Sequence, residues 1–306
     1  LTITKSLTSL LKGEISLQSE QGKGSEFTIT IPVQKSKNQK KPVPENPHPP
    51  TEKTDSLDLG NKKVLVVDDE PAQLALTLEF LKNHLLKFDT AENGKKALEL
   101  LGKNQYDLIL TDIQMPIMDG FQLMNAIKKD KNLTKTPVIA LSGRTDMKDE
   151  VYTLTGFTAK LTKPFKPKDL LLSISEVFNV ETKTEEKPLI PKNDFTPKHN
   201  EFYNLEDIYM FSGQDKEAMH IIIKAFLESS QENIAKIKSH KKDKHYDAIG
   251  KIAHKMLPMF KQMRITPVIP VLERLEKKVE VSDTEIDELI QQLQTVLREL
   301  ENEVTV

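Results

Sequence analysis

The sequence predicts a five-stranded, doubly wound parallel sheet of the α/β class over residues 62–179 and an all-α four-helix bundle over residues 201–306. In the first region, apolar strand-like runs alternate five times with helical patterns, which indicates parallel strands covered by helices on both faces. In the second region, apolar residues recur every 3.6 residues, which is typical of helices packed in an antiparallel bundle. Residues 1–33 predict a helix and a β-hairpin, and segments 34–61 and 180–200 are predicted to be polar linkers.

The composition leaves room for two modest domains, with 306 residues, a formal net charge of −2 and no cysteine. The balanced charge gives no indication of a nucleic-acid-binding surface. The lack of cysteine excludes disulfides and fits a reducing compartment. No apolar run approaches the roughly 20 residues of a membrane-spanning helix, and no signal peptide is visible. We therefore expect a cytoplasmic fragment with no membrane contact of its own, whereas membrane attachment of a longer parent stays open.

The first 33 residues are expected to be part of a larger fold. An amphipathic helix precedes two alternating runs at 14–19 and 26–33, and the segment 22–24 supplies a Gly-rich turn between them. Such alternation around a glycine turn predicts a hairpin. Because the chain opens with Leu1 inside the helix, we expect it to be a piece of a longer protein. The linker that follows is rich in Lys, Pro and Asn and cannot bury a core.

Five strands and five helices are expected in the central region. The strands lie near 63–68, 87–91, 107–111, 137–142 and 157–162, and the helices near 71–85, 94–102, 119–129, 146–155 and 167–178. Because the carboxyl ends of parallel strands line up along one edge of the sheet, ligands bind in the crevice there. The polar side chains that follow these strands should therefore converge on one spot, and they are Asp68, Asp69, Asp112, Ser142 and Lys163.

The three aspartates in this set predict a cation site. Carboxylates packed together repel one another, which raises their pKa values unless a cation neutralises them. A hard site with few oxygen ligands suits Mg²⁺, and such a site can accept a phosphoryl group. Taken singly, Asp68 and Asp69 also fit helix caps, Asp112 fits a turn and Lys163 fits a solvated surface lysine. Their joint occurrence favours the site.

Residues 62–179 resemble a response-regulator receiver domain, which implies a flavodoxin-like fold and a role in a two-component phosphorelay. Several matched elements in the family's order and spacing carry the resemblance: the acidic pair, the run from Leu110 to Pro116, Met118-Asp119-Gly120, Ser142 and Lys163-Pro164. In this resemblance Asp112 is the phospho-acceptor. The Mg²⁺ ligands are Asp69 directly, Asp68 through water, Asp112, and the backbone carbonyl of Gln114.

The resemblance also assigns roles to the remaining residues of the pocket. Lys163 places a positive charge on a phosphoryl oxygen, and Ser142 donates its hydroxyl to the attached phosphoryl group. Gly143 keeps the approach open, and the Lys163-Pro164 bond is expected to be cis, which an X-Pro bond tolerates. One position departs from the family, because Lys160 stands where an aromatic switch residue is usual. The resemblance therefore does not extend to coupling through that aromatic side chain.

The C-terminal helices have identifiable limits. Helical periodicity runs from Asp215 to about Lys238 and from Asp243 to Met263. Thr266-Pro267 predicts a helix start, with Thr as the cap and Pro in the first turn. The pair Ser282 and Glu285, three residues apart, predicts a capping box before the last helix.

His254 is the candidate functional residue of this region. On a helical wheel it falls away from the buried stripe, so we expect it to point to solvent, where a neutral imidazole is a competent phosphoryl acceptor. The region resembles a histidine phosphotransfer domain, and Ala253-His254-Lys255 matches that family's phosphorylation site. Leu257 and Pro258 depart from it, because the family has Lys and Gly there. Pro258 also predicts a kink, and Lys255 or Lys261 is left to replace the missing lysine.

The alternative for His254 is an ordinary exposed helical residue on a bundle with a purely structural role. His240 and His245 lie in a lysine-rich helix connection and are expected to be merely solvated. The last part of residues 1–33, Leu11 to Ile15 followed by Gly22-x-Gly24-x-x-Phe27, is similar to the end of a histidine-kinase ATPase domain. The nucleotide-binding boxes of that family do not occur in the sequence, so ATP would bind only to the intact parent, and whether this chain is itself an enzyme stays open.

Together these resemblances predict the C-terminal part of a hybrid sensor histidine kinase. Its partners would be an upstream kinase histidine domain and a downstream response regulator, and the direction of phosphoryl flow between Asp112 and His254 is open. The alternative is a non-enzymatic interaction module in which the bundle carries no phosphate. A metal-dependent phosphatase is disfavoured, because the Asp-x-Asp nucleophile motif is missing at Asp112-Ile113-Gln114.

Overall fold

The computed structural model describes residues 8, 13–20, 24–30, 32, 62–143, 147–180 and 200–305. The chain divides into two units, Leu1–Thr51 and Glu52–Val306, and each unit is described by itself. The predicted N-terminal helix and both predicted linkers fall almost entirely outside the described residues. Among the described residues, no helix is both long enough and apolar enough to span a bilayer.

The N-terminal unit contains an antiparallel hairpin. Strand β1 (Glu14–Glu20) pairs with β2 (Gly24–Thr30), with Glu14 opposite Thr30 at the open end. The alternating side chains of the two runs account for this pairing. The hairpin predicted from the sequence is confirmed.

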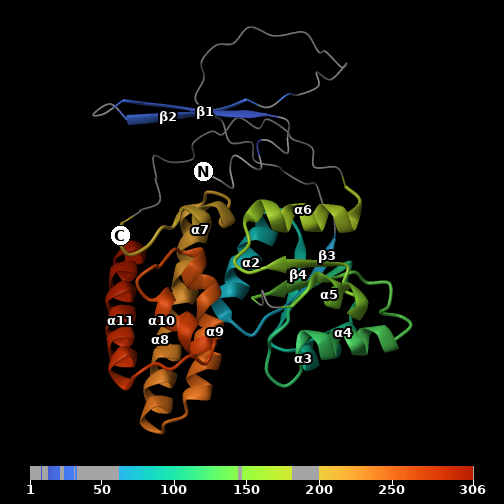
Figure 1. Cartoon of the computed structure of the whole chain (residues 1–306). Coiled ribbons are helices and arrows are strands. Elements are labelled where there is room, and N and C mark those ends of the chain that lie inside the picture. The colour runs from blue at the N-terminus through green and yellow to red at the C-terminus, as the bar shows by residue number, and fades with distance from the viewer. Residues whose placement is uncertain are drawn as a thin grey trace. The chain divides into compact units, whose positions relative to one another are not determined.

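The second unit contains a five-stranded parallel sheet in the order β4-β3-β5-β6-β7 (Figure 1). Its strands are β3 (Lys63–Val67), β4 (Lys87–Ala91), β5 (Leu108–Asp112), β6 (Val138–Ser142) and β7 (Ala159–Thr162). The three central strands are almost wholly buried, whereas the edge strands β4 and β7 are partly exposed. This burial explains the near-continuous apolar runs in β3, β5 and β6, and the predicted parallel sheet is confirmed.

Helices cover both faces of the sheet, as predicted. They are α2 (Pro71–Asn83), α3 (Gly94–Leu101), α4 (Gly120–Lys129), α5 (Asp149–Thr155) and α6 (Pro167–Phe178). One apolar cluster joins α2 and α6 to one face, and a second joins α3, α4 and α5 to the other. Helix α5 begins at Asp149 rather than near 146, and residues 144–146 lie outside the described part of the chain.

The C-terminal region is helical. A short helix α7 (Glu206–Phe211) precedes four helices that pack on one another as a bundle: α8 (Lys216–Lys242), α9 (Tyr246–Gln262), α10 (Ile269–Glu276) and α11 (Asp283–Thr305). Their apolar stripes form the bundle core. The predicted capping box is confirmed, because the Ser282 amide donates to Glu285 and the Glu285 amide donates to the Ser282 hydroxyl.

One local prediction in the bundle was wrong. Helix α10 begins at Ile269 rather than at Thr266-Pro267, because residues 266–268 form a turn and Pro270 occupies the first helical turn instead. Helix α9 runs through Pro258 to Gln262, and the kink expected at this proline stays a prediction. Pro258 is buried, so packing of this helix against its neighbours offsets the lost backbone hydrogen bond.

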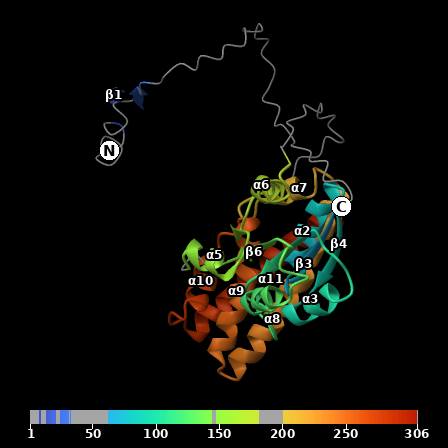
Figure 2. The ribbon, with the colours of Figure 1, turned by 90° about the vertical axis from the view of Figure 1, so that its right-hand side faces the viewer.

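The sheet domain and the helical region share one apolar core. Helix α2 packs on α8, and α7 contacts both α2 and α6 (Figures 1 and 2). The fully buried ring of Phe211 lies 6.1 Å from the ring of Phe80 and 6.0 Å from that of Phe165, between centroids. The Asn83 side-chain amide also donates to the Phe211 carbonyl at 3.2 Å. This apolar contact holds the bundle against the α2 side of the sheet.

Candidate functional site

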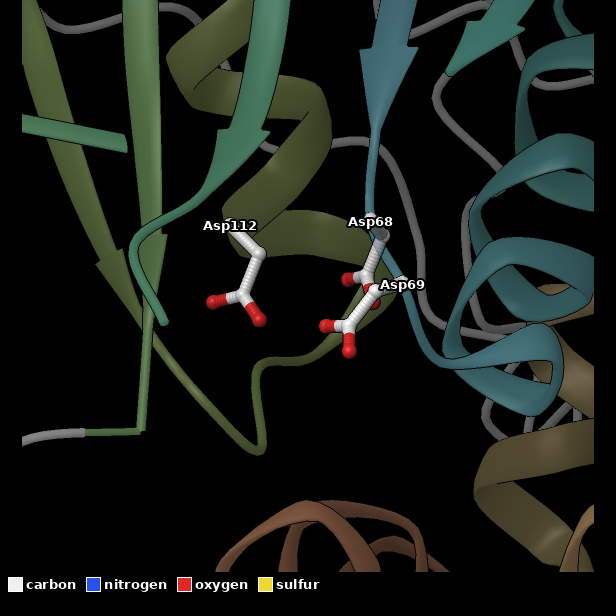
Figure 3. Close-up of side chains that lie close together, drawn as sticks. All are labelled: Asp68, Asp69 and Asp112. Atoms are coloured by element: carbon white, nitrogen blue, oxygen red, sulfur yellow. The ribbon is translucent and has the colours of Figure 1, made fainter. Parts of the chain in front are cut away.

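Three carboxylates meet at the carboxyl edge of the sheet (Figure 3). Asp68 and Asp69 follow β3, and Asp112 ends the neighbouring strand β5. One carboxylate oxygen from each lies within 4.8 Å of those of the other two. The convergence predicted from the strand ends is confirmed, and the donor set consists of hard oxygen ligands of the kind that Mg²⁺ prefers.

Lys163 reaches into the same cluster from the end of β7. Its side chain is buried, and its ammonium lies 2.7 Å from an Asp68 oxygen and 3.5 Å from an Asp112 oxygen. Burial alone would lower the pKa of Lys163, but the charges of Asp112 and Asp68 outweigh burial and raise it. The lysine is therefore held as a fixed cation inside the pocket, and the predicted cis bond to Pro164 is confirmed.

The acceptor candidate Asp112 is an unusual carboxyl. Burial raises the pKa of Asp112 to about 6, the charge of Lys163 opposes that shift, and the charge of Asp68 adds to it. The repulsion expected among clustered carboxylates is thus present at this residue. The single positive charge of Lys163 does not balance three carboxylates, so the cluster can attract a further cation.

Ser142 ends β6 beside Asp112 in the sheet and is fully buried. Its hydroxyl lies 2.8 Å from the Tyr152 hydroxyl of α5, a contact that the sequence did not reveal. Lys160, the position that departs from the receiver pattern, places its ammonium 2.9 Å from Asp149 and 4.8 Å from the centre of the Tyr152 ring. The aromatic group beside Ser142 therefore comes from α5 rather than from β7.

The carboxylate cluster opens into a cleft of about 1360 Å³ between the sheet edge and the bundle. On the sheet side it is lined by Asp69, Gln114, Gly143 and Lys163, and on the bundle side by His254, Lys255 and Pro258. The sites predicted separately in the two regions therefore share one cleft. Nothing in the spacing of the sequence indicated this, because the two sets lie more than 85 positions apart.

The prediction that His254 points to open solvent was wrong. Its side chain is 20% exposed and faces the sheet edge, because the bundle packs on α2 and brings this side of α9 over the pocket. The imidazole lies so close to Gly143 that a Cβ at this glycine would be 3.4 Å from Cε1 and 3.8 Å from Nε2. Gly143 was expected to keep the approach to the pocket open, and His254 is the side chain that approaches it.

Two further contacts cross the cleft. The ammonium of Lys255 pairs with a carboxylate oxygen of Asp69, and the hydroxyl of Ser229 on α8 donates to Glu70. Burial raises the pKa of Glu70 to about 7, and the hydrogen bond from Ser229 opposes this shift. Of the two lysines considered as replacements, Lys255 contacts the acidic pocket, whereas Lys261 pairs with Glu273 at 2.6 Å.

Sequence reasoning missed Glu70, Tyr152, Ser229 and Glu276. Glu70 carried a weak signal, because it directly follows the acidic pair. Glu276, which lies 2.5 Å from the Nδ1 atom of His254, belongs to a different helix and carried none. Contacts between different elements depend on packing angles, which local patterns do not contain.

The comparisons identify the sheet domain. The family model described as response regulator receiver domain matches residues 64–175. This part of the chain is a receiver domain. The chain is also 33% identical, over 171 residues, to a region of the autoinducer 2 sensor kinase/phosphatase LuxQ of Vibrio vulnificus, with 56% of this chain and 19% of that protein covered. Receiver domains act in two-component phosphorelay signalling and bind Mg²⁺ at an acidic site.

Other relatives match a shorter part of the chain. The heme response regulator HssR of Staphylococcus aureus is 37% identical over 125 residues, which cover 40% of this chain and 54% of that protein. The solved structure of the chemotaxis response regulator CheY4 of Vibrio cholerae is 31% identical, covers 39% of this chain and 99% of that one, and has a TM-score of 0.37. The chain spans about a fifth of the length of LuxQ and about half that of HssR.

Proposed function

We propose that the receiver accepts a phosphoryl group on Asp112 in a magnesium-dependent reaction and exchanges it with His254 of the same chain. One observation carries this proposal: the imidazole of His254 lies against Gly143 in the cleft that the receiver's acidic pocket opens into. Asp112 belongs to that acidic pocket, and the imidazole of His254 lines the bundle side of the cleft. In this reading, residues 62–179 are the receiver, 201–306 a phosphotransfer-like bundle and 1–33 a remnant of a kinase ATPase domain.

The donor set fits a magnesium ion. Asp68, Asp69, Asp112 and the backbone carbonyl of Gln114 would hold it, since three carboxylate oxygens already lie within 4.8 Å of one another. When bound, magnesium would neutralise charge on the carboxylates and on the phosphoryl oxygens. In the docked arrangement the Lys255 ammonium occupies part of this acidic site.

The residues of the chain supply the rest of the chemistry. An oxygen of Asp112 attacks the phosphorus of the donor, the bond from phosphorus to the donor breaks, and an acyl phosphate forms. Lys163, held within 3.5 Å of Asp112, then binds a phosphoryl oxygen. Ser142 would leave Tyr152 and donate its hydroxyl to the same group. Phosphoryl transfer needs this positioning and charge neutralisation more than covalent help.

The alternative is an interaction module without phosphate on the bundle. The burial of Leu257 and Pro258 at positions where phosphotransfer domains have Lys and Gly favours it. In our proposal, Lys255 takes the role of the missing lysine. Gly143, on the receiver wall of the cleft, leaves the space that the missing glycine would otherwise provide. An upstream kinase histidine domain and a downstream response regulator are the proposed partners, and ATP would be used only by a longer parent.

Labelling of the full chain tests the proposal. The chain is incubated with Mg²⁺ and acetyl phosphate or a phosphorylated kinase, and phosphoaspartate is separated from phosphohistidine by their acid and base stability. Asp112→Asn should abolish all label, and His254→Ala should remove only phosphohistidine. His245→Ala, at the N-cap of the helix that carries His254, is the control and should keep both. Phosphohistidine that persists in His254→Ala, or label that persists in Asp112→Asn, would refute these assignments.

A further inference from the structure

A carboxylate contacts the Nδ1 atom of the His254 imidazole. Its Nδ1 atom lies 2.5 Å from Oε1 of Glu276, and both side chains are about a quarter exposed, at 20% and 27%. His254 is in α9 and Glu276 ends α10, which packs closely along α9. The contact therefore belongs to the rigid part of the bundle rather than to a mobile surface side chain.

The two ring nitrogens of His254 face different surroundings. Nδ1 meets Glu276, whereas Nε2 lies on the Gly143 side, at the receiver wall of the cleft. A carboxylate accepts a hydrogen bond and cannot donate one, so it selects the tautomer that carries its proton on Nδ1. The lone pair is then on Nε2, toward the receiver.

We infer that Glu276 is a positioning residue for phosphoryl transfer at His254, because it fixes the ring and leaves Nε2 as the attacking nitrogen. This inference rests on the proposed function. The neighbouring carboxylate on α10 is not equivalent, since Glu273 pairs with Lys261 at 2.6 Å. Among the described side chains, Glu276 pairs with the histidine.

The transfer step balances with these groups. The Nε2 lone pair forms a bond to phosphorus while the bond from phosphorus to the Asp112 oxygen breaks, and Asp112 regains its negative charge. The ring keeps its proton on Nδ1 and becomes positively charged. Glu276 stabilises that charge through the hydrogen bond that it already makes, and the reverse step returns the phosphoryl group to Asp112 with the same groups in place.

A simple ion pair between two helices would have little effect on the reaction. A partly exposed pair of this kind contributes about 1 kcal/mol or less to stability, and its loss would leave the tautomer and the reaction rate unchanged. The two roles therefore differ in what they predict for the ring nitrogens and for the rate of phosphohistidine formation.

The test compares Glu276→Gln, Glu276→Ala and the matched control Glu273→Gln in the full chain. Nitrogen-15 NMR reports the His254 tautomer, and phosphorus-31 NMR together with isomer-specific detection reports which nitrogen carries phosphate after incubation with Mg²⁺ and acetyl phosphate. The wild type should hold its proton on Nδ1 and carry phosphate on Nε2. Glu276→Ala should mix the tautomers and slow phosphohistidine formation by about tenfold or more.

The remaining variants separate charge from orientation. Glu276→Gln keeps an acceptor for Nδ1 without the charge, so its rate should fall between those of the wild type and Glu276→Ala. Glu273→Gln should stay within about twofold of wild type, and Asp112 labelling should be equal in all variants. A wild-type rate and tautomer in Glu276→Ala, or phosphate on Nδ1, would overturn the role of Glu276. The proposed exchange itself would be unaffected by that result. A wild type without phosphohistidine would remove the proposed exchange itself.

Discussion

The acidic pocket of the receiver and the histidine face of the bundle are two halves of one cleft, but their residues are placed by different physical means. The pocket residues each follow a strand of a parallel sheet, so the sheet itself brings Asp69, Asp112 and Lys163 together. His254 stands on the side of a helix, and what it faces depends on where the bundle docks. The pocket is therefore local to one domain, whereas the complete cleft depends on the contact between two.

The same contrast appears in the contacts that each half makes. Lys163 meets Asp68 deep in the receiver, with both side chains almost fully buried. Lys255 meets Asp69 across the cleft, with 35% of its side chain exposed. Exposed pairs contribute less than buried, well-packed ones, so apolar burial around Phe211 rather than the ion pair should hold the two halves together.

The largest expected effect concerns exchange within one chain. When Asp112→Asn and His254→Ala chains are mixed, each supplies the group that the other lacks, but only between molecules. A tethered partner acts at an effective concentration of about 1 mM, so phosphohistidine should form about 100-fold more slowly in a mixture at about 10 μM than in wild type. Equal rates would show that the exchange runs between chains, and a mixture of wild type and His254→Ala provides the control.

The second prediction removes the apolar contact between the halves. Phe211→Ala deletes a fully buried ring beside Phe80 and Phe165 and should cost about 3–5 kcal/mol in the free energy of unfolding. Hydrogen exchange should speed up in α2 and α7 before the rest of the chain. Phe226→Ala, within the bundle core, is the matched control and should lower stability without exposing α2. Unchanged exchange in α2 of Phe211→Ala would contradict the shared core.

The third prediction uses the pH dependence of Glu70. Its pKa is about 7 in the folded chain, against an ordinary value of 4.5, because burial disfavours its charge. The folded state therefore holds a proton that the unfolded state releases, so the free energy of unfolding should fall as pH rises from about 4.5 to 7, by about 3 kcal/mol at most. Below this range the contribution is fully present, and above it the loss is complete.

Glu70→Gln keeps a hydrogen-bond acceptor for Ser229 without the titration. Urea unfolding at pH 5 and pH 8 should show a smaller difference between the two conditions for this variant than for the wild type. Glu99→Gln, on the exposed side of α3, should retain the wild-type difference. If Glu70→Gln and wild type showed the same pH dependence, the carboxyl would be solvated rather than enclosed by the bundle.

The smallest expected effect belongs to Lys255. Lys255→Gln removes the ammonium from Asp69 and should weaken the contact across the cleft by about 1 kcal/mol or less. Phosphohistidine formation should slow several-fold, while Asp112 labelling by acetyl phosphate is retained. Lys251→Gln, one turn earlier on α9, should match the wild type in both measurements. Loss of Asp112 labelling in Lys255→Gln would mean that the lysine serves the receiver reaction itself.

Much of this site could be predicted because its signals are local. Strand ends, turn residues and the Lys163-Pro164 pair lie within a few residues of the elements that place them, and the structure confirms each. The start of α10 could not be found in the same way, because both Pro267 and Pro270 fit the first turn of a helix and tertiary packing selects between them. The contact from Tyr152 to Ser142 likewise needed the packing of α5.

By itself the sequence determined the parallel sheet, the convergence of three carboxylates and a lysine at its edge, and a helical region with a candidate histidine. These follow from periodicity and from the geometry of parallel strands, which every such sheet obeys. The tertiary structure alone decided that His254 faces the receiver, that Glu276 holds its Nδ1 atom and that Lys255 meets Asp69. The packing of α10 on α9 brings Glu276 to His254, and the apolar core shared by the sheet domain and the bundle brings His254 and Lys255 to the receiver.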